Sequence, residues 1–462
     1  MSALDAKVAA ARAVGQIARR AGRGGGTSLP GKILTRLEPD AIGRLSRRLP
    51  EGCAVISATN GKTTTAAMVA SVLARQGRRV VANRAGANMA GGVASALLNA
   101  ARWGGAIDGE FGLFEVDEFW LDTVTPALAP RCVLLGNLFR DQLDRYGELE
   151  TIADRWAAMV ARLPSTTALA LNADDPLIAD LGSERAGVTY FGIEDRSAAA
   201  TEMQHASDSK RCRRCGAAYV YEAIYLGHLG IYACPSCGRR RPDPAVSASD
   251  VVLRGTRSAG FTLHAGGEAQ AVALPLPGLY NVYNALGAAA LCVSLGMAPG
   301  QIVDGLEHVN AAFGRSERIT LGDHELSVLL IKNPAGANEV LRTLRLEDEG
   351  VDLLGILNDS TADGRDISWI WDADFELLTD VARRITCSGT RAAELALRFK
   401  YAGVDERRLH VQPDLAAALD GALAAASSSQ VFALPTYTAL LELRAELGRR
   451  GHVESFWETT GR

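Results

Sequence analysis

The stretch that decides the fold is Val55-Ile-Ser-Ala-Thr-Asn-Gly-Lys-Thr-Thr-Thr65, which runs from a short apolar strand through a turn of small residues into a helix over 66–75. The backbone N–H groups of such a turn, backed by the N-terminus of the helix, form a concave site for anions. The lysine of this pattern reaches the outer phosphates of a nucleotide, and the hydroxyl group that follows it can ligate Mg²⁺. We therefore predict a binding site for ATP and Mg²⁺ here. The alternative is a strand-turn-helix unit without a ligand.

Short apolar strands alternate with helical stretches on both sides of this turn. Such alternation predicts an α/β fold with parallel sheets and crossover helices. The expected strands of a first series lie at 55–56, 80–81, 113–114, 133–135, 169–171 and 188–191, and those of a second series at 327–331, 353–357, 385–387, 409–411 and 431–434. Between the two series, residues 274–296 indicate a strand, a turn and a long apolar helix.

The chain has 462 residues, which exceeds the ~250 to 300 residues at which one hydrophobic core stops growing, so several domains are expected. We expect residues 1–48 to form an N-terminal helix and linker, with a break at Pro30-Gly31. A central ATP-binding domain would span 49–318 and carry an insertion at 205–244, where charge, glycine and cysteine replace the strand pattern. A second, Rossmann-like α/β domain would fill 319–462.

Charge and hydropathy exclude some classes of function. Lysine and arginine total 49 against 53 acids, a net charge of −4, which gives no overall electrostatic reason to expect nucleic-acid binding. No apolar run reaches 18 residues, and charges within the first twenty residues argue against a signal peptide, so we expect a cytoplasmic protein. Between Met1 and Arg36 seven basic residues stand against one acid. A solvated helix explains them, and contact with an anionic ligand or the inner face of the membrane is the alternative.

Polar side chains follow two expected strands of the first series at the point where each strand ends. Glu115 follows the strand at 113–114, and Asn137 and Asp141 follow the strand at 133–135. Open parallel sheets bind ligands at the carboxyl ends of their strands. Glu115 is therefore a candidate Mg²⁺ ligand, while helix capping and solvated acids are the structural alternative.

Four of the eight cysteines form two Cys-x-x-Cys pairs inside the expected insertion, 18 residues apart and each followed by glycine. This spacing is typical of a tetrahedral zinc ribbon. We predict one structural zinc bound by Cys212, Cys215, Cys234 and Cys237. Four thiolates leave no open coordination position, so a catalytic role for the zinc is not expected. A redox dithiol, unmetallated cysteines and nucleic-acid binding by the surrounding arginines are the alternatives.

Residues 50–320 resemble the Mur ligases, the ATP-dependent amide-forming enzymes of peptidoglycan synthesis. The matching segments, in the order found in that family, are Thr59-Asn-Gly-Lys-Thr-Thr64, the strand-end Glu115, Asn137 to Gly147, Leu171-Asn-Ala-Asp-Asp-Pro176 and Gly278-Leu-Tyr-Asn-Val-Tyr-Asn284. The resemblance implies that Lys62 and Thr63 hold the ATP phosphates and Mg²⁺, and that Glu115 supports a metal. The nucleotide-binding residues that it implies are Thr59, Asn60, Gly61, Lys62, Thr63, Thr64, Asn281, Asn284 and Arg315. The chain departs from the family at Gln142, where histidine is common.

The C-terminal third resembles the C-terminal domain of the MurT family, the synthetase subunits of lipid II isoglutaminyl synthase. The matching segments are Asn333-Pro-Ala-Gly-Ala-Asn338, the acidic stretch 357–376, Ser388-Gly-Thr-Arg391 and Pro435-Thr-Tyr-Thr438, and the zinc-ribbon insertion extends the likeness to nearly the whole chain. The resemblance implies that ATP activates the D-glutamate α-carboxylate of the lipid II stem peptide and that ammonia converts it to D-isoglutamine. It also implies a heterodimer with a GatD-like glutamine amidotransferase subunit that supplies the ammonia.

In that family the partner brings a Cys and a His, and an acid of the MurT-type subunit is thought to complete the triad. The resemblance implies Asp366 for this role, with Asp363 as the second choice. This chain has no glycine-flanked nucleophilic cysteine of the kind that amidotransferases need, so a partner must supply one. Two other functions stay open at this point: an autonomous Mur or folylpolyglutamate-type ligase that adds an amino acid, and a zinc-ribbon ATPase that acts on nucleic acid.

Overall fold

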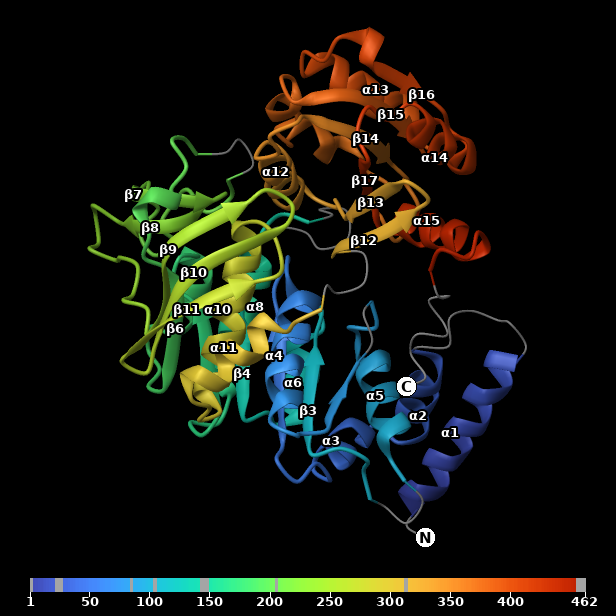
Figure 1. The fold of residues 1–462 in the computed structure, drawn as a ribbon. Helices are drawn as coiled ribbons and strands as arrows, with labels where there is room; N and C mark the ends of the chain where they lie inside the picture. The colour runs from blue at the N-terminus through green and yellow to red at the C-terminus, as the bar shows by residue number, and fades with distance from the viewer. Residues whose placement is uncertain are drawn as a thin grey trace.

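The computed structural model describes residues 3–20, 28–83, 86–102, 106–141, 149–203, 207–310 and 315–453, without the side chains of 3, 16–20, 315 and 316. These residues form two mostly parallel sheets with helices around them and a separate two-stranded hairpin. In Figure 1 the orange and red C-terminal unit lies above the central sheet. The expected α/β fold is therefore confirmed, while the domain boundaries drawn from the sequence stay a prediction.

A nine-stranded sheet forms the central unit, in the order β11-β10-β9-β6-β5-β4-β1-β3-β2. Its strands are β1 (Cys53–Ser57), β2 (Val80–Ala82), β3 (Phe111–Glu115), β4 (Cys132–Leu135), β5 (Ala168–Asn172), β6 (Val188–Ile193), β9 (Val246–Arg254), β10 (Ser258–Ala265) and β11 (Glu268–Leu274). Strands β1 to β6 pair in parallel and coincide with the six strands of the first predicted series. Because β1 lies between β3 and β4, the segments that follow these three strands meet at one edge of the sheet.

Strands β9 and β10, which the sequence analysis missed, extend this sheet as an antiparallel edge with β11. Burial alternates residue by residue along β10, because one face of this edge meets the core and the other does not. The prediction relied on continuous apolar runs, which mark strands buried on both faces. A half-buried strand carries no such run.

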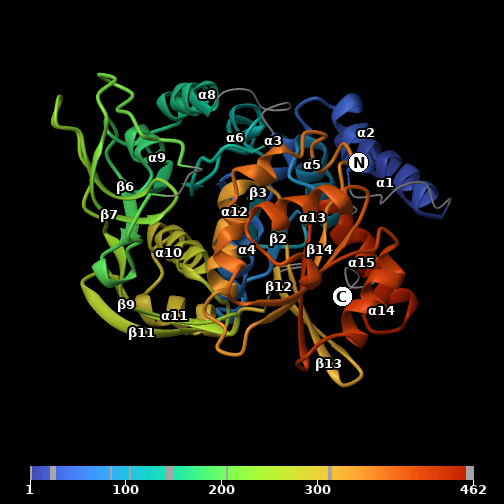
Figure 2. The same cartoon turned by 90° about the horizontal axis from the view of Figure 1, so that it is seen from above.

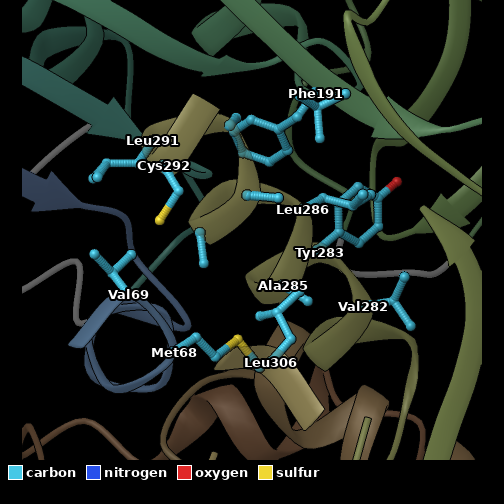
Figure 3. Packing of buried hydrophobic residues seen from close by; sticks show 14 of the residues in the cluster. Met68, Val69, Phe191, Val282, Tyr283, Ala285, Leu286, Leu291, Cys292 and Leu306 are labelled. Carbon is cyan, nitrogen blue, oxygen red and sulfur yellow. The ribbon is translucent and has the colours of Figure 1, made fainter. Parts of the chain in front are cut away.

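Helices cover both faces of the central sheet. One layer contains α4 (Lys62–Arg75), α10 (Leu279–Ser294) and α11 (Pro299–Glu307), and the other contains α5 (Ala90–Ala100), α6 (Leu121–Leu128), α8 (Leu149–Arg162) and α9 (Pro176–Leu181). Along β1, Ile56 belongs to the first core and Val55 to the second, as alternate side chains of a strand do. Figure 3 shows side chains of the buried helix α10, among them Ala285 and Leu286, in one cluster with Met68 of α4, so that α10 packs against α4.

At the N-terminal end, α1 (Ala3–Arg20), α2 (Leu29–Leu37) and α3 (Ala41–Ser46) pack near α5 (Figure 1). The predicted break at Pro30-Gly31 is wrong, because both residues lie in the first turn of α2, where proline costs no helical hydrogen bond. Gly31 is buried there, and a Cβ atom on it would lie 2.0 Å from the carbonyl oxygen of Gly91. Glycine therefore allows α2 to approach α5 closely.

None of the helices that the structure describes combines the length and the apolar composition that crossing a membrane requires. Helix α1 is 18 residues long but carries Asp5, Lys7 and Arg12. Its Leu4 and Val8 are buried against the rest of the protein. This helix is therefore an amphipathic element of the fold.

The C-terminal unit is a six-stranded sheet in the order β12-β13-β17-β14-β15-β16, seen from above in Figure 2. Its elements are β12 (Arg315–Leu321), β13 (His324–Leu329), α12 (Pro334–Leu344), β14 (Val351–Ile356), β15 (Ala382–Ser388), α13 (Ala392–Tyr401), β16 (Leu409–Val411), α14 (Leu415–Ala424), β17 (Gln430–Pro435) and α15 (Tyr437–Arg449). Strands β13 to β17 pair in parallel at the positions of the second predicted series. The antiparallel strand β12 was not predicted.

Candidate active site

The turn between β1 and α4 is held in shape by the segment that follows β4. The Thr59 backbone N–H donates to the Asn137 carbonyl oxygen at 3.0 Å, and the Asn60 backbone N–H donates to Asn137 Oδ1 at 2.9 Å. Gly61 has a left-handed φ of +89°, and a Cβ atom on it would lie 2.0 Å from Asn284 Oδ1. Only glycine fits this position without strain. The predicted anion-binding turn is therefore a rigid, preformed loop.

Lys62 begins α4 and is buried, with its Nζ 2.8 Å from Glu118 Oε2. Burial by itself would lower the pKa of Lys62, but the carboxylates of Glu118, Asp117 and Asp141 outweigh it, and the pKa is raised. The ammonium group therefore stays charged at neutral pH. A fixed positive charge at the start of a helix suits a phosphate ligand.

Two hard oxygen ligands meet beside Lys62. Thr63 Oγ1 donates a hydrogen bond to Glu115 Oε2 at 2.8 Å, and Glu115 is buried at the end of β3. Asn83 fixes the Glu115 backbone, because its side-chain oxygen accepts from the Glu115 N–H and its amide donates to the Glu115 carbonyl, both at 2.9 Å. A hydroxyl and a carboxylate oxygen are the donors that Mg²⁺ prefers. The residues present thus fit this ion.

The first turns of α10 supply two amides near the loop. Asn281 donates to the Pro277 carbonyl oxygen at 2.7 Å, and Asn284 donates to Asn281 Oδ1 at 3.0 Å. Asn284 Oδ1 also accepts from Thr65 Oγ1 at 3.4 Å, so α10 and α4 are joined directly. Of the other predicted residues, Thr64 is buried beside the loop, Gln142 lies outside the described residues, and Arg315 begins β12 with a side chain that the structure does not describe.

A cavity of about 110 Å³ opens between the two sheet units at this loop. Asn60, Gly61, Thr64 and Asn284 line it from the central unit, and residues 329–340 close it from the C-terminal unit. Across it, Asn60 Nδ2 donates to Asn333 Oδ1 at 3.3 Å, and Asn333 Nδ2 donates to Asn60 Oδ1 at 3.1 Å. Four of the nine sequence-predicted nucleotide-binding residues therefore border a cleft whose other wall belongs to the second α/β unit.

Sequence reasoning missed Lys332, which also reaches this cleft. Its Nζ forms an ion pair with Asp141 and lies 3.4 Å from the Thr59 carbonyl oxygen. Lysine is rare in this chain, with six residues in total. That scarcity was the one signal that could have drawn attention to Lys332.

The two aspartates proposed for the partner's triad lie in the acidic loop after β14 but have different environments. Asp363 is buried and accepts from the backbone N–H of Thr438 at 2.7 Å and from its hydroxyl group. Asp366 is exposed, and its Oδ1 accepts from the Ser368 backbone N–H at 2.8 Å, which lowers the pKa of Asp366. Asp363 is thus engaged inside the chain, whereas Asp366 faces outward as an ionised carboxylate.

The four predicted zinc ligands come together around the hairpin of β7 (Val220–Leu226) and β8 (Leu229–Ala233), with all four Sγ atoms within 4.8 Å of one another. The Sγ atoms of Cys212 and Cys237 are 3.6 Å apart, and those of Cys215 and Cys234 are 3.4 Å apart. Thiolates around one zinc with Zn–S bonds of ~2.3 Å stand roughly 3.8 Å apart, so the cluster fits the ion. Burial alone would raise the pKa of Cys212, but the Arg214 and Cys215 backbone N–H groups lower it to about 6.

The hairpin is also part of the cleft. Leu226 and Leu229 at its tip line the same cavity as the phosphate loop. Arg241, just after the second cysteine pair, places its Nε 2.5 Å from Asp174 Oδ1, and Tyr283 of α10 donates to Asp174 Oδ2 at 2.6 Å. The insertion is therefore tied to the helix that carries Asn281 and Asn284.

The arginines around the cysteines form ion pairs with the central unit. Arg213 pairs with Asp154, and both Arg214 and Arg239 pair with Asp180. These contacts give the basic cluster a role inside the protein. Arg211 and Arg240 of the same cluster are exposed.

Two family descriptions match the chain. "Mur ligase middle domain" matches residues 56–229, and "MurT ligase C-terminal" matches residues 330–440. Among solved structures, the fold is similar to that of a pseudomurein peptide ligase type C from Methanothermus fervidus, with a TM-score of 0.65, 23% identity and coverage of 87% of this chain and 79% of that one. It is also similar to MurF from Acinetobacter baumannii, with a TM-score of 0.66, 19% identity and coverage of 91% and 81%.

Two curated relatives match almost from end to end. Both are described as "Lipid II isoglutaminyl synthase (glutamine-hydrolyzing) subunit MurT". The Streptococcus pneumoniae protein is 32% identical over 92% of this chain and 93% of its own length. The Staphylococcus aureus protein is 33% identical over 94% and 96%. The fold, the phosphate loop and this identity over the whole length agree, and the chain belongs to the MurT family of Mur-type ligases.

Proposed function

We propose that this chain is the synthetase subunit of an enzyme that amidates the D-glutamate α-carboxylate of the lipid II stem peptide to D-isoglutamine, with ATP as the energy source. The observation that carries the proposal is the match over more than 90% of both chains to relatives named as subunits of lipid II isoglutaminyl synthase. The rigid phosphate loop beside a cleft between two α/β units supports the use of ATP.

Within this proposal, the loop residues Thr59 to Thr64 bind the phosphates, and Asn281, Asn284 and Arg315 bind the rest of the nucleotide. Thr63 and Glu115 hold Mg²⁺, because their oxygens already lie within 2.8 Å of each other. The ion neutralises charge on the transferring phosphoryl group when bound. Lys62, held by Glu118, adds a fixed positive charge at the same place.

The substrate carboxylate is a poor electrophile, so it must be activated before ammonia can attack it. A carboxylate oxygen of the substrate attacks the γ-phosphorus of ATP, the bond from that phosphorus to the bridging oxygen breaks, and ADP leaves. Ammonia then attacks the carbonyl carbon of the acyl phosphate, inorganic phosphate leaves with the bonding electrons, and the nitrogen loses a proton. Positioning of the reactants supplies most of the rate enhancement in such transfers. The cleft between the two units, bridged by Asn60 and Asn333, is where water would be excluded.

Ammonia comes from a GatD-like glutaminase partner in this proposal, since both relatives are named as subunits of a glutamine-hydrolyzing synthase. Asp366 is the acid that orients the partner's catalytic histidine. Its exposure supports this role, because a carboxylate that serves another chain must reach the surface of its own. Asp363 is already engaged by Thr438, which argues against it.

The cysteine cluster would hold one structural zinc through Cys212, Cys215, Cys234 and Cys237. Four thiolate ligands confer rigidity and leave no position for a reactant. The zinc would therefore stabilise the hairpin and take no part in the reaction.

Turnover of ATP by the purified complex tests the proposal. We expect ADP release that depends on lipid II together with glutamine or ammonium. Mass spectrometry should find a product in which an amide has replaced the α-carboxylate of the D-glutamate. ATP turnover that depends on a free amino acid would instead support an autonomous ligase. Turnover that depends on nucleic acid would contradict both.

A further inference from the structure

Two of the six lysines of the chain meet at the phosphate loop from opposite sides of the cleft. Lys62 starts α4 in the central unit, and Lys332 lies between β13 and α12 in the C-terminal unit. The Thr59 carbonyl oxygen lies 3.4 Å from the Nζ atoms of both lysines. The second α/β unit therefore places a cation next to the first one.

The two lysines differ in how they are held. Lys62 is buried and paired with the buried Glu118. The side chain of Lys332 is 27% exposed, and its partner is Asp141 on the segment after β4. Asp141 Oδ1 has no hydrogen-bond partner among the described residues, although it is buried. Lys332 is thus the less constrained of the two, and its four-carbon stem allows the ammonium group to move.

The backbone beside Lys332 is fixed at this location. Asn333 caps α12 by accepting from the Gly336 N–H at 2.8 Å, and its amide is joined to Asn60 in both directions. Lys332 also influences the loop electrostatically. Burial would raise the pKa of Glu118, but Lys62 and Lys332 together keep it lowered. Both ammonium groups therefore act on the same small region.

We propose that Lys332 is a second phosphate-binding cation of this site and contacts the terminal phosphate of ATP. The inference rests on the proposed use of ATP. In the absence of nucleotide Asp141 holds the ammonium group, and the triphosphate takes over that contact when it binds. Phosphoryl transfer is promoted by positive charge around the transferring group. A lysine from the C-terminal unit also links closure of the cleft to the presence of the γ-phosphate.

The test compares affinities for ADP and for a non-hydrolysable ATP analogue, measured by isothermal titration calorimetry on the full chain with Mg²⁺. Lys332→Gln should weaken binding of the analogue relative to ADP by roughly 10- to 100-fold, the worth of one charged hydrogen bond. Lys332→Arg should retain part of the preference for the ATP analogue over ADP. Circular dichroism and thermal melting establish that each variant is folded.

A matched control separates phosphate binding from a mere tether between the units. Glu347, after α12, accepts from the backbone N–H and the hydroxyl group of Thr256 in the central unit at 2.6 and 2.8 Å, away from the phosphate loop. Glu347→Ala should leave the ratio of the two affinities unchanged. If Lys332→Gln weakens the binding of both nucleotides equally, or of neither, Lys332 does not bind the γ-phosphate. If the unaltered chain binds neither nucleotide, the proposed use of ATP fails as well.

Discussion

The phosphate loop and the acidic loop after β14 both carry candidate catalytic residues, but they are built in opposite ways. In the phosphate loop, Lys62 and Glu115 are buried and already paired with Glu118 and Thr63 of the same unit. In the acidic loop, Asp366 is exposed and held by one backbone N–H group. The first region has the form of a complete site for a small ligand. The second has the form of half a site, which a partner chain would complete.

Replacement of Lys62 tests the complete site and should have the largest effect. Lys62→Ala should reduce ATP-dependent amidation by on the order of 10³-fold or more with either nitrogen donor, because it removes the fixed charge from the phosphates. It also leaves the buried Glu118 without this partner, and an unpaired buried charge is destabilising. The double variant with Glu118→Gln is therefore the control for folding. Retained turnover in a folded variant would refute the phosphate-loop assignment.

Replacement of Asp366 tests the half site. Asp366→Asn should reduce glutamine-dependent activity of the complex by on the order of 10²- to 10⁴-fold, as expected when the acid that orients a catalytic histidine is lost. Activity with a high concentration of ammonium at alkaline pH should stay near that of the unaltered complex. Assays of both nitrogen donors on one preparation measure this. Equal loss with both donors would move Asp366 to the ligase site, and no loss with either would leave it a loop cap.

The rigidity of the phosphate loop can be tested at Gly61. Gly61→Ala should weaken nucleotide binding by roughly tenfold or more, because the added methyl group would collide with Asn284 and the left-handed backbone costs about 1–2 kcal/mol for alanine. Gly77 is the matched control, since it has a φ of +75° at the other end of α4 and nothing within 4 Å of an added Cβ atom. Gly77→Ala should leave the affinity for nucleotide, measured by calorimetry, unchanged. Equal affinities for the two variants would mean that the loop adapts.

Asp363 should behave as a structural residue. Asp363→Ala removes the acceptor of two hydrogen bonds from Thr438, so the free energy of unfolding should fall by about 1–3 kcal/mol. The loss should appear as a lower midpoint of thermal or urea unfolding. Activities with glutamine and ammonium should change in the same proportion. A selective loss with glutamine would make Asp363 the acid of the triad after all.

Loss of metal from the cysteine cluster should have the smallest effect on nucleotide binding. Cys212→Ser should lower the zinc content below one ion per chain and weaken ADP binding only a few-fold, because the hairpin supplies Leu226 and Leu229 to the cavity but no phosphate contact. Elemental analysis and calorimetry measure the two quantities. Protein purified without chelators that contains no zinc would contradict the assignment of the cluster.

The local patterns of the sequence were sufficient to predict strands β1 to β6 and β13 to β17 of the two sheets. The strand-turn-helix stretch around Lys62 and the apolar strands of both series are short-range signals, and the structure has the corresponding elements. The two cysteine pairs were recognisable by spacing alone, and their thiols meet around the hairpin. Half-buried β10 was missed because the prediction relied on continuous apolar runs, and the start of helix α2 was misread because Pro-Gly is also a common turn signal.

The sequence alone therefore determined which loop is the candidate for binding phosphate, since that candidacy resides in consecutive residues whose backbone N–H groups converge. Only the tertiary structure decided what stands opposite that loop. Lys332 and Asn333 reach Thr59 and Asn60 across 273 residues of chain. Likewise, Asp363 and Asp366 are three residues apart in one acidic run, and only the approach of Thr438 distinguishes a buried tether from an exposed carboxylate. Such contacts depend on how the two sheets pack against each other, and no local spacing encodes that arrangement.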